Sequence, residues 1–172
     1  MNDAPHRWSA FDTRFGKFAA AVDHEGRVVR FWFHAAGGKF RPEGSEDAAA
    51  LAPVRAQLEE YCAGTRRAFD LAVAPQGGSD FERAVWQAMT QIPFGETVSY
   101  GAIAKRLGDS AAARAVGVAC NANPIPLIIP CHRVIGAGGA LVGFGGGLPL
   151  KRALLDFESV VAGRPRDLFA TA

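Results

Sequence analysis

The stretch IIPCHRVIG, residues 128–136, places a thiol, an imidazole and a guanidinium in succession inside an apolar run. Pro130 stands directly before Cys131, and Pro124 and Pro126 lie a few residues upstream. Proline fixes φ and lacks a backbone donor, so this segment cannot form a helix interior or a central strand. We therefore expect a rigid, extended segment that delivers Cys131 to a fixed place.

Cys131 and His132 form a possible pair of nucleophile and base. A free thiol titrates at about 8.5, and an imidazole oriented by a carboxylate such as Glu158 can accept its proton. Adjacent side chains of a regular strand point to opposite faces. The pair therefore works only if the backbone turns here or a water bridges thiol and imidazole. The alternative is an inert buried cysteine, because buried free cysteines are common.

The composition indicates a globular protein of one ordinary domain or two small ones. The chain has 172 residues, of which 49% are hydrophobic and 21% charged, enough for a sizeable core. No apolar run approaches the roughly 18 residues of a membrane-spanning helix, and the polar N-terminus lacks an apolar signal core. We expect a cytoplasmic protein without membrane contact. The net charge of +2 means that any surface for nucleic acid would be local.

The chain has three cysteines and no CxxC pair, at Cys62, Cys120 and Cys131. An odd number without paired spacing argues against a disulfide framework and against a cysteine-rich zinc site. In a reducing compartment these residues should be free thiols. The candidate metal ligands of the first half of the chain have no convincing spacing; they are His6, His24, His34 and Cys62. We therefore predict no metal.

The first half of the chain is rich in expected strands. Residues 15–33 predict a hairpin, because aromatic and β-branched segments flank the turn DHEG. Residues 53–63 predict a helix that a glycine stops, and residues 69–73 predict another strand. The segment PQGGS, 75–79, has the proline and glycine punctuation of a linker.

The second half opens with an expected amphipathic helix. Ser79 and Glu82 match a capping box, and apolar residues recur on one face until Pro93. Further on, GAGGALVGFGGG, residues 136–147, holds seven glycines, which allow backbone amides to approach a ligand closely. The segment LPLKRALLDFE, residues 148–158, predicts a final helix with a proline near its first turn.

Two short helices are expected at 99–107 and 111–120, with Asp109 or Ser110 as the cap of the second. A helix pair with a glycine-containing turn is typical of a helix-turn-helix, although any helical hairpin looks similar. Alanines and glycines surround Arg114 on the second helix. Either this helix packs closely on another with Arg114 solvated at the rim, or it approaches a nucleic-acid groove with Arg114 as its probe.

The run PCHRVIG, with NPIPLI before it and a glycine-rich loop and LLDFE after it, resembles the O6-alkylguanine-DNA alkyltransferases, also called methylated-DNA–protein-cysteine methyltransferases. IPFGETVSYGAIA and AARAVGVACNANP resemble the same family in the same order. The resemblance covers roughly residues 79–158. It implies an α+β fold, in which a small ribonuclease H-like N-terminal domain of β-sheet and helix precedes a mostly helical C-terminal domain with a helix-turn-helix.

The domain organisation that we expect has four parts. These are an N-terminal α/β domain at 1–75, a linker at 76–79, a C-terminal DNA-binding and alkyl-transfer domain at 80–160, and a tail at 161–172. The resemblance implies a DNA repair protein that flips O6-alkylguanine out of duplex DNA and takes the alkyl group irreversibly onto itself. O4-alkylthymine stays open as a second substrate.

The resemblance also implies a role for each catalytic residue. Cys131 accepts the alkyl group in one in-line displacement, and His132 deprotonates it through a bound water. Glu158 orients His132, and Asn123 braces the turn that carries the site. Because a thioether is a poor leaving group, each molecule should act once. No metal or organic cofactor is needed.

DNA contacts follow from the same resemblance. Tyr100 contacts the flipped guanine and the adjacent phosphate, and Arg114 enters the base stack as wedge side chains do. Helix-turn-helix proteins normally read the major groove, but this family places the helix in the minor groove, which suits small residues such as Ala113 and Gly117. The expected partner is double-stranded DNA carrying alkylated guanine, bound by a protein that is a monomer in solution.

The resemblance implies a base pocket lined by Val134, Gly143, Phe144 and Gly145. Phe144 stands where tyrosine is usual, and Gly145 stands where some members carry a hydroxyl residue, so the range of alkyl groups stays open. Lys151 matches a family lysine near the active site. Three alternatives remain: a lesion-binding relative without transfer activity, a Cys–His hydrolase, and a plain helix-turn-helix regulator.

Overall fold

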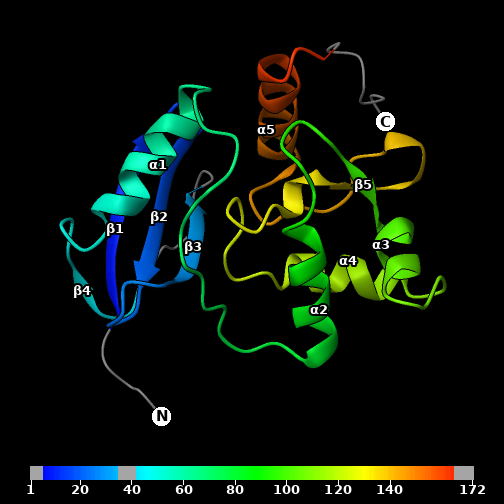
Figure 1. The fold of residues 1–172 in the computed structure, drawn as a ribbon, viewed down its shortest axis with the longest axis horizontal. Helices are drawn as coiled ribbons and strands as arrows, with labels where there is room; N and C mark the ends of the chain where they lie inside the picture. Colours follow the sequence, from blue (N-terminus) through cyan, green and yellow to red (C-terminus); the bar gives the residue numbers. More distant parts are fainter. Residues whose placement is uncertain (1–5, 35–41, 165–172) are drawn as a thin grey trace. The chain divides into compact units, whose positions relative to one another are not determined.

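The computed structural model describes residues 6–34 and 42–164, so residues 165–172 of the expected tail lie outside the described part. The chain divides into two compact units between Gln76 and Gly77. It has an α+β fold with a small sheet and, within the described ranges, five α-helices (Figure 1). No described helix has both the length and the apolar character that crossing a membrane requires.

The N-terminal unit contains a four-stranded sheet in the order β3-β2-β1-β4 (Figure 1). Its strands are β1 at Arg7–Thr13, β2 at Gly16–Val22, β3 at Val28–His34 and β4 at Ser45–Glu46. The pairs β1–β2 and β2–β3 are antiparallel, whereas β4 runs parallel to β1. The predicted hairpin is therefore confirmed. Strand β1 was not predicted, since its buried positions are Ser9 and Phe11 and the serine interrupts the apolar alternation.

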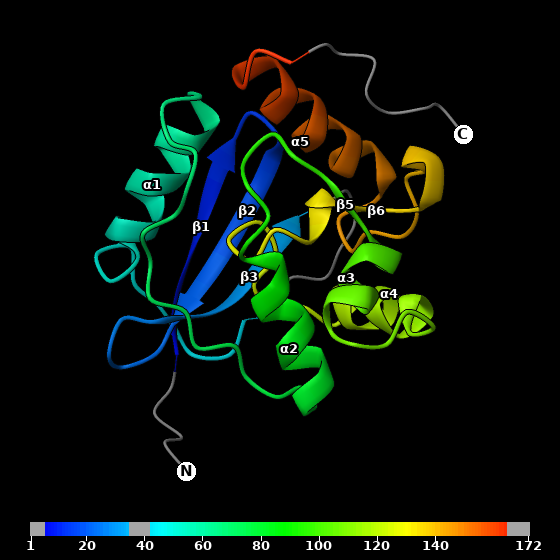
Figure 2. The same cartoon turned by 45° about the vertical axis from the view of Figure 1, so that its right-hand side comes forward.

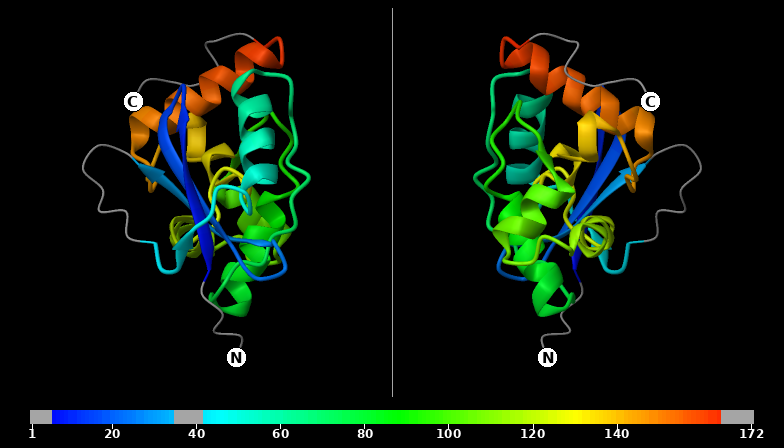
Figure 3. Two further views of the ribbon diagram at one scale, coloured as in Figure 1. Left: turned by 90° about the vertical axis from the view of Figure 1, so that its left-hand side faces the viewer. Right: turned by 90° about the vertical axis from the view of Figure 1, so that its right-hand side faces the viewer.

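Aromatic side chains and one helix supply the core of this unit. The ring of Phe18 packs edge-on against those of Phe31 and Phe33, with centroids 5.7 and 4.9 Å apart. Helix α1, Ala52–Cys62, lies along β1 (Figure 2 and Figure 3). It buries Leu58 and Tyr61, and it confirms the helix predicted at 53–63.

The strand predicted at 69–73 is wrong. Only Val73 pairs, in a single bridge to Val28. The Asp70 backbone N–H donates to Oε1 of Gln57 at 2.8 Å, and Nε2 of Gln57 donates to the Asp70 carbonyl at 2.9 Å. A side chain of α1 therefore satisfies the backbone groups that a neighbouring strand would otherwise pair.

The C-terminal unit is mostly helical (Figure 1). Its elements are α2 at Asp80–Met89, β5 at Val98–Ser99, α3 at Tyr100–Arg106, α4 at Ala113–Asn121, β6 at Val134–Ile135 and α5 at Leu148–Val161. The short strands β5 and β6 pair in parallel, and α3 and α4 pack side by side (Figure 2). The Trp86 indole N–H donates to the Ala119 carbonyl at 2.8 Å, which joins α2 to α4.

Local capping rules predict one helix start and miss another. The capping box is confirmed, because Ser79 Oγ accepts from the Glu82 N–H and the Ser79 N–H donates to Glu82 Oε2. Helix α4 instead begins after Ala112 with no side-chain cap. The Asp109 carboxylate accepts from the Ala111 N–H, so it shapes the turn before α4 and does not cap the helix as predicted.

Candidate active site

A tight turn carries Cys131 to its place, and the predicted extended approach is therefore wrong. Leu127 has φ of 72°, in the left-handed region, and the Ile129 N–H donates to the Ile125 carbonyl at 2.9 Å. Asn123 braces this turn on both sides. Its Nδ2 donates to the Ile129 carbonyl at 2.8 Å, and its Oδ1 accepts from the Ile125 N–H at 3.0 Å.

The backbone changes direction again at the thiol. Residues Cys131–Arg133 form a single 3₁₀ turn with all three side chains buried. Successive side chains of such a turn are separated by about 120°, whereas those of a strand point to opposite faces. The backbone turn that a Cys131–His132 pair requires is therefore present.

Cys131 rests as a thiol. Its side chain is 8% exposed, and burial raises its pKa above the ordinary value. The Asn123 side chain, the Lys151 ammonium and backbone N–H groups lower the pKa of Cys131 in part. These groups stabilise a thiolate once it forms, but the thiol needs a base to lose its proton.

His132 is placed as that base. Its Nε2 lies 2.8 Å from Oε1 of Glu158, and both side chains are fully buried. Burial works against the charged form of Glu158, but His132 and Arg133 outweigh it and hold the pKa of Glu158 well below its usual range. An ionised carboxylate only accepts, so Nε2 carries the proton and Nδ1 is left as the acceptor of the neutral ring. Nδ1 is buried and has no hydrogen-bond partner within the described part of the chain.

Glu158 also accepts hydrogen bonds from groups that the sequence did not predict. Nε and Nη2 of Arg133 donate to the two carboxylate oxygens at 2.8 and 2.9 Å, and the Gly95 N–H donates at 3.2 Å. Nη1 of Arg133 donates to the Ile92 carbonyl at 2.8 Å. A guanidinium inside an apolar run was the available signal, because a buried arginine requires an anionic partner.

Lys151 joins three segments of the site. Its ammonium is fully buried and donates to the carbonyls of Val134 at 2.7 Å, Val142 at 3.3 Å and Gly143 at 3.5 Å. It also lies 3.5 Å from the Tyr100 hydroxyl, which donates to the Val142 carbonyl at 2.9 Å. Burial lowers the pKa of Lys151 and raises that of Tyr100 to about 12. The lysine therefore fastens the glycine-rich loop to β6.

A groove of about 610 Å³ lies on α3, α4 and the glycine-rich loop. It is lined by Ser99, Tyr100, Gly101, Ala113, Arg114, Gly117, Val118, Asn121, Ala137, Val142 and Gly143. Five residues predicted from the sequence thus share one surface, and Arg114 is exposed on it. Val134 is buried, whereas Phe144 is half-buried and Gly145 exposed, and these three lie outside the lining of this groove.

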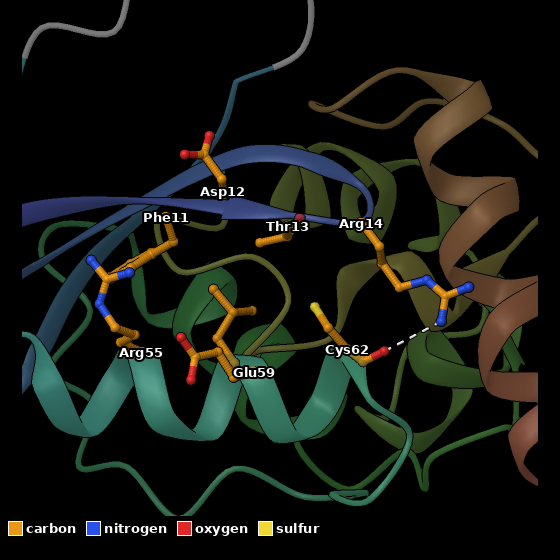
Figure 4. A pocket seen from close by; sticks show the side chains of 8 residues that line it. Phe11, Asp12, Thr13, Arg14, Arg55, Glu59 and Cys62 are labelled. Carbon is orange, nitrogen blue, oxygen red and sulfur yellow. Dashed lines mark hydrogen bonds between the residues drawn. The ribbon is translucent and has the colours of Figure 1, made fainter.

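A second pocket, of about 330 Å³, belongs to the N-terminal unit (Figure 4). Cys62 lies at one end of it, where Nη1 of Arg14 donates to the Cys62 carbonyl at 3.3 Å. Burial raises the pKa of Cys62 to about 11, so this thiol is not activated. Over residues 6–34 and 42–164, no three His, Cys, Asp or Glu side chains gather in a way that could hold a metal ion.

Comparison with known proteins identifies the family. The family model described as "6-O-methylguanine DNA methyltransferase, DNA binding domain" matches residues 80–160. A methylated-DNA–protein-cysteine methyltransferase of Methanosarcina acetivorans is 41% identical over 152 residues, which cover 88% of this chain and 97% of that relative. The chain belongs to this family. A methyltransferase of the same name from Mycobacterium bovis is 48% identical over 128 residues, 74% of this chain and 76% of the relative.

Solved structures of methyltransferases agree with the family. A crystal structure of Mycobacterium tuberculosis OGT in complex with DNA has a TM-score of 0.83 and 38% identity, covering 95% of this chain and 99% of that one. The M. tuberculosis O6-methylguanine methyltransferase has a TM-score of 0.81 and 40% identity, covering 95% and 96%. Of the three cysteines of the present methyltransferase, Cys131 is the one that adjoins the His132–Glu158 pair.

Proposed function

We propose that this methyltransferase repairs alkylated DNA by moving the alkyl group of O6-alkylguanine to its own Cys131, once per molecule. The observation that carries the proposal is the buried pair of His132 and Glu158 directly beside a buried thiol, in a chain of this family. O4-alkylthymine is the second candidate substrate.

The transfer uses one proton and one displacement. The Cys131 proton passes through a water to Nδ1 of His132, while Glu158 holds Nε2–H and stabilises the transient imidazolium. The thiolate attacks the alkyl carbon in line, the S–C bond forms, and the C–O6 bond breaks with its electron pair left on guanine. The proton then passes to guanine. The thiol becomes a thioether, which nothing regenerates, and no cofactor takes part.

The partner is double-stranded DNA, approached through its minor groove. We propose that α3 and α4 act as a helix-turn-helix, with α4 against the groove and Arg114 inserted into the base stack. Ala113 and Gly117 on the same surface allow a close approach, and Tyr100 borders the position of the flipped base. Flipping costs a few kcal/mol, and less for a badly paired damaged base.

The flipped base would enter beside the glycine-rich loop, against Val134, Gly143, Phe144 and Gly145. The Lys151 hydrogen bonds to this loop support a preformed pocket wall. We further propose that residues 80–160 are the DNA-binding and alkyl-transfer domain, joined through 76–79 to a ribonuclease H-like domain at 1–75. The protein would act as a cytoplasmic monomer.

The test is the mass of the protein after incubation with a duplex holding one O6-methylguanine. We expect a gain of one methylene, about 14 Da, on the peptide that contains Cys131, at no more than one per molecule. Cys131→Ser should gain nothing, and the matched variant Cys120→Ser should react like the parent. An adduct on Cys62 or Cys120 would overturn the assignment. DNA binding without any adduct would support a lesion-binding protein, and repeated turnover on an ester would support a hydrolase.

The role of Arg114 has its own test. Arg114→Ala should weaken transfer from duplex DNA much more than transfer from a free O6-alkylguanine base, because only the duplex must be opened. The exposed Arg106, at the end of α3, provides a matched control as Arg106→Ala. Equal losses on both substrates would refute insertion into the base stack.

A further inference from the structure

The Arg133 guanidinium is held from three sides inside the C-terminal unit. It is 7% exposed. Two of its nitrogens meet the two oxygens of Glu158 at 2.8 and 2.9 Å, and the third meets the Ile92 carbonyl at 2.8 Å. The Cζ atom of Arg133 lies 5.7 Å from the centre of the Phe94 ring. This paired, parallel geometry fixes orientation as well as charge, and the alkyl-transfer mechanism as derived above assigns it no task.

We propose that Arg133 is a positioning residue that sets the protonation state of the His132–Glu158 pair, keeping the carboxylate anionic and the resting imidazole neutral. The inference rests on the proposed alkyl transfer, in which a neutral His132 must accept the thiol proton. The proposal adds Arg133 to the His132–Glu158 pair as a third side chain.

The charges around His132 support this role. Glu158 of α5 faces its Nε2 and favours the imidazolium, whereas Arg133 beside it and Lys151 of α5 disfavour it. The Cys131 thiol directly precedes His132 in the chain. Burial lowers the pKa of His132, and the two cations add to this effect. Loss of Arg133 would remove one of the charges that oppose Glu158 and would shift the ring toward the imidazolium, which cannot act as a base.

The same arginine anchors the carboxylate in position. Through Ile92 and Phe94 it contacts the connector between α2 and β5, and the Gly95 N–H of that connector donates to Glu158. Gly95 has φ of 77°, and a Cβ there would lie 2.6 Å from the Ala162 Cβ. The connector can therefore close over Glu158 only with glycine at this position.

The experiment compares the pH dependence of transfer from a free O6-alkylguanine base in the parent, Arg133→Gln and Arg133→Lys. In Arg133→Gln the acidic limb should move to higher pH by about one unit or more, because an unopposed Glu158 stabilises the imidazolium. Arg133→Lys keeps the positive charge and should move the acidic limb less. Arg164→Gln, which breaks the exposed pair with Glu96, should leave the limb in place. A loss of equal size at every pH would reduce Arg133 to a structural role and overturn the proposal.

The His132 pKa can also be measured directly by NMR of histidine-labelled protein, and this measurement does not depend on alkyl transfer. We expect a pKa below the ordinary value in the parent and a higher one in Arg133→Gln. A parent value at or above the ordinary one would overturn the proposal even if neither variant folds. If the parent forms no adduct but its His132 pKa behaves as expected, the proposed function fails while the role of Arg133 stands.

Discussion

Replacing Glu158 with glutamine tests the buried charge cluster most directly. The carboxylate is fully buried and accepts hydrogen bonds from His132, from two nitrogens of Arg133 and from the Gly95 N–H. Glutamine has nearly the same shape but offers one acceptor oxygen and an NH₂ donor. An amide nitrogen in place of Oε2 opposes two donors, Arg133 Nε and the Gly95 N–H. An amide nitrogen in place of Oε1 still opposes Arg133 Nη2, even when His132 changes tautomer so that its Nε2 accepts.

The cost can be worked out from these contacts. One or two lost hydrogen bonds to charged or polarised donors correspond to about 1.5–6 kcal/mol, at roughly 1.5–3 kcal/mol each. Removing one partner of a buried ion pair independently costs about 3–5 kcal/mol, because the Arg133 cation stays buried without compensation. We therefore expect Glu158→Gln to lower the free energy of unfolding of the C-terminal unit by about 3–5 kcal/mol.

Urea unfolding, with amide hydrogen exchange of α5 as the local probe, measures this effect. The matched control is Glu96→Gln, because Glu96 pairs with Arg164 at 2.9 Å while both side chains are more than 40% exposed, at 44% and 43%. An exposed pair contributes about 0–1 kcal/mol. If the two variants lost the same stability, the reasoning that burial makes the Glu158 contacts strong would be refuted.

Three further outcomes are expected. The pKa of Glu158 is lower in the folded state than its ordinary value, so the ionised carboxylate stabilises the fold above about pH 4.3 and this contribution is lost as the pH falls. The difference in unfolding free energy between the parent and Glu158→Gln should therefore narrow in acid, and a constant difference would contradict this. Lys151→Met should slow transfer roughly tenfold or more and speed amide exchange in residues 136–147, whereas unchanged exchange would show that the lysine does not hold the loop. Ser79→Ala should lower the stability of the C-terminal unit by about 1 kcal/mol in urea titrations, with Ser79→Thr close to the parent, since threonine also caps.

Local features were largely readable from the sequence. The capping box at Ser79 and the β2–β3 hairpin depend on hydrogen bonds between residues close in the chain, so short patterns encode them. The strand predicted at 69–73 failed because its outcome depended on Gln57 of α1. A backbone segment with strand-like residues still requires a free sheet edge, and a short pattern does not record whether one exists.

The chemistry of the site could also be predicted only in part from the sequence. Residue types and their order indicated that Cys131, His132 and Glu158 could form a nucleophile, a base and an orienting group. Only the tertiary structure decided that Glu158 is shared with Arg133 and that Lys151 fastens the glycine-rich loop. The physical reason is desolvation: a buried charge must find a partner, and the fold alone determines which distant residue is within reach.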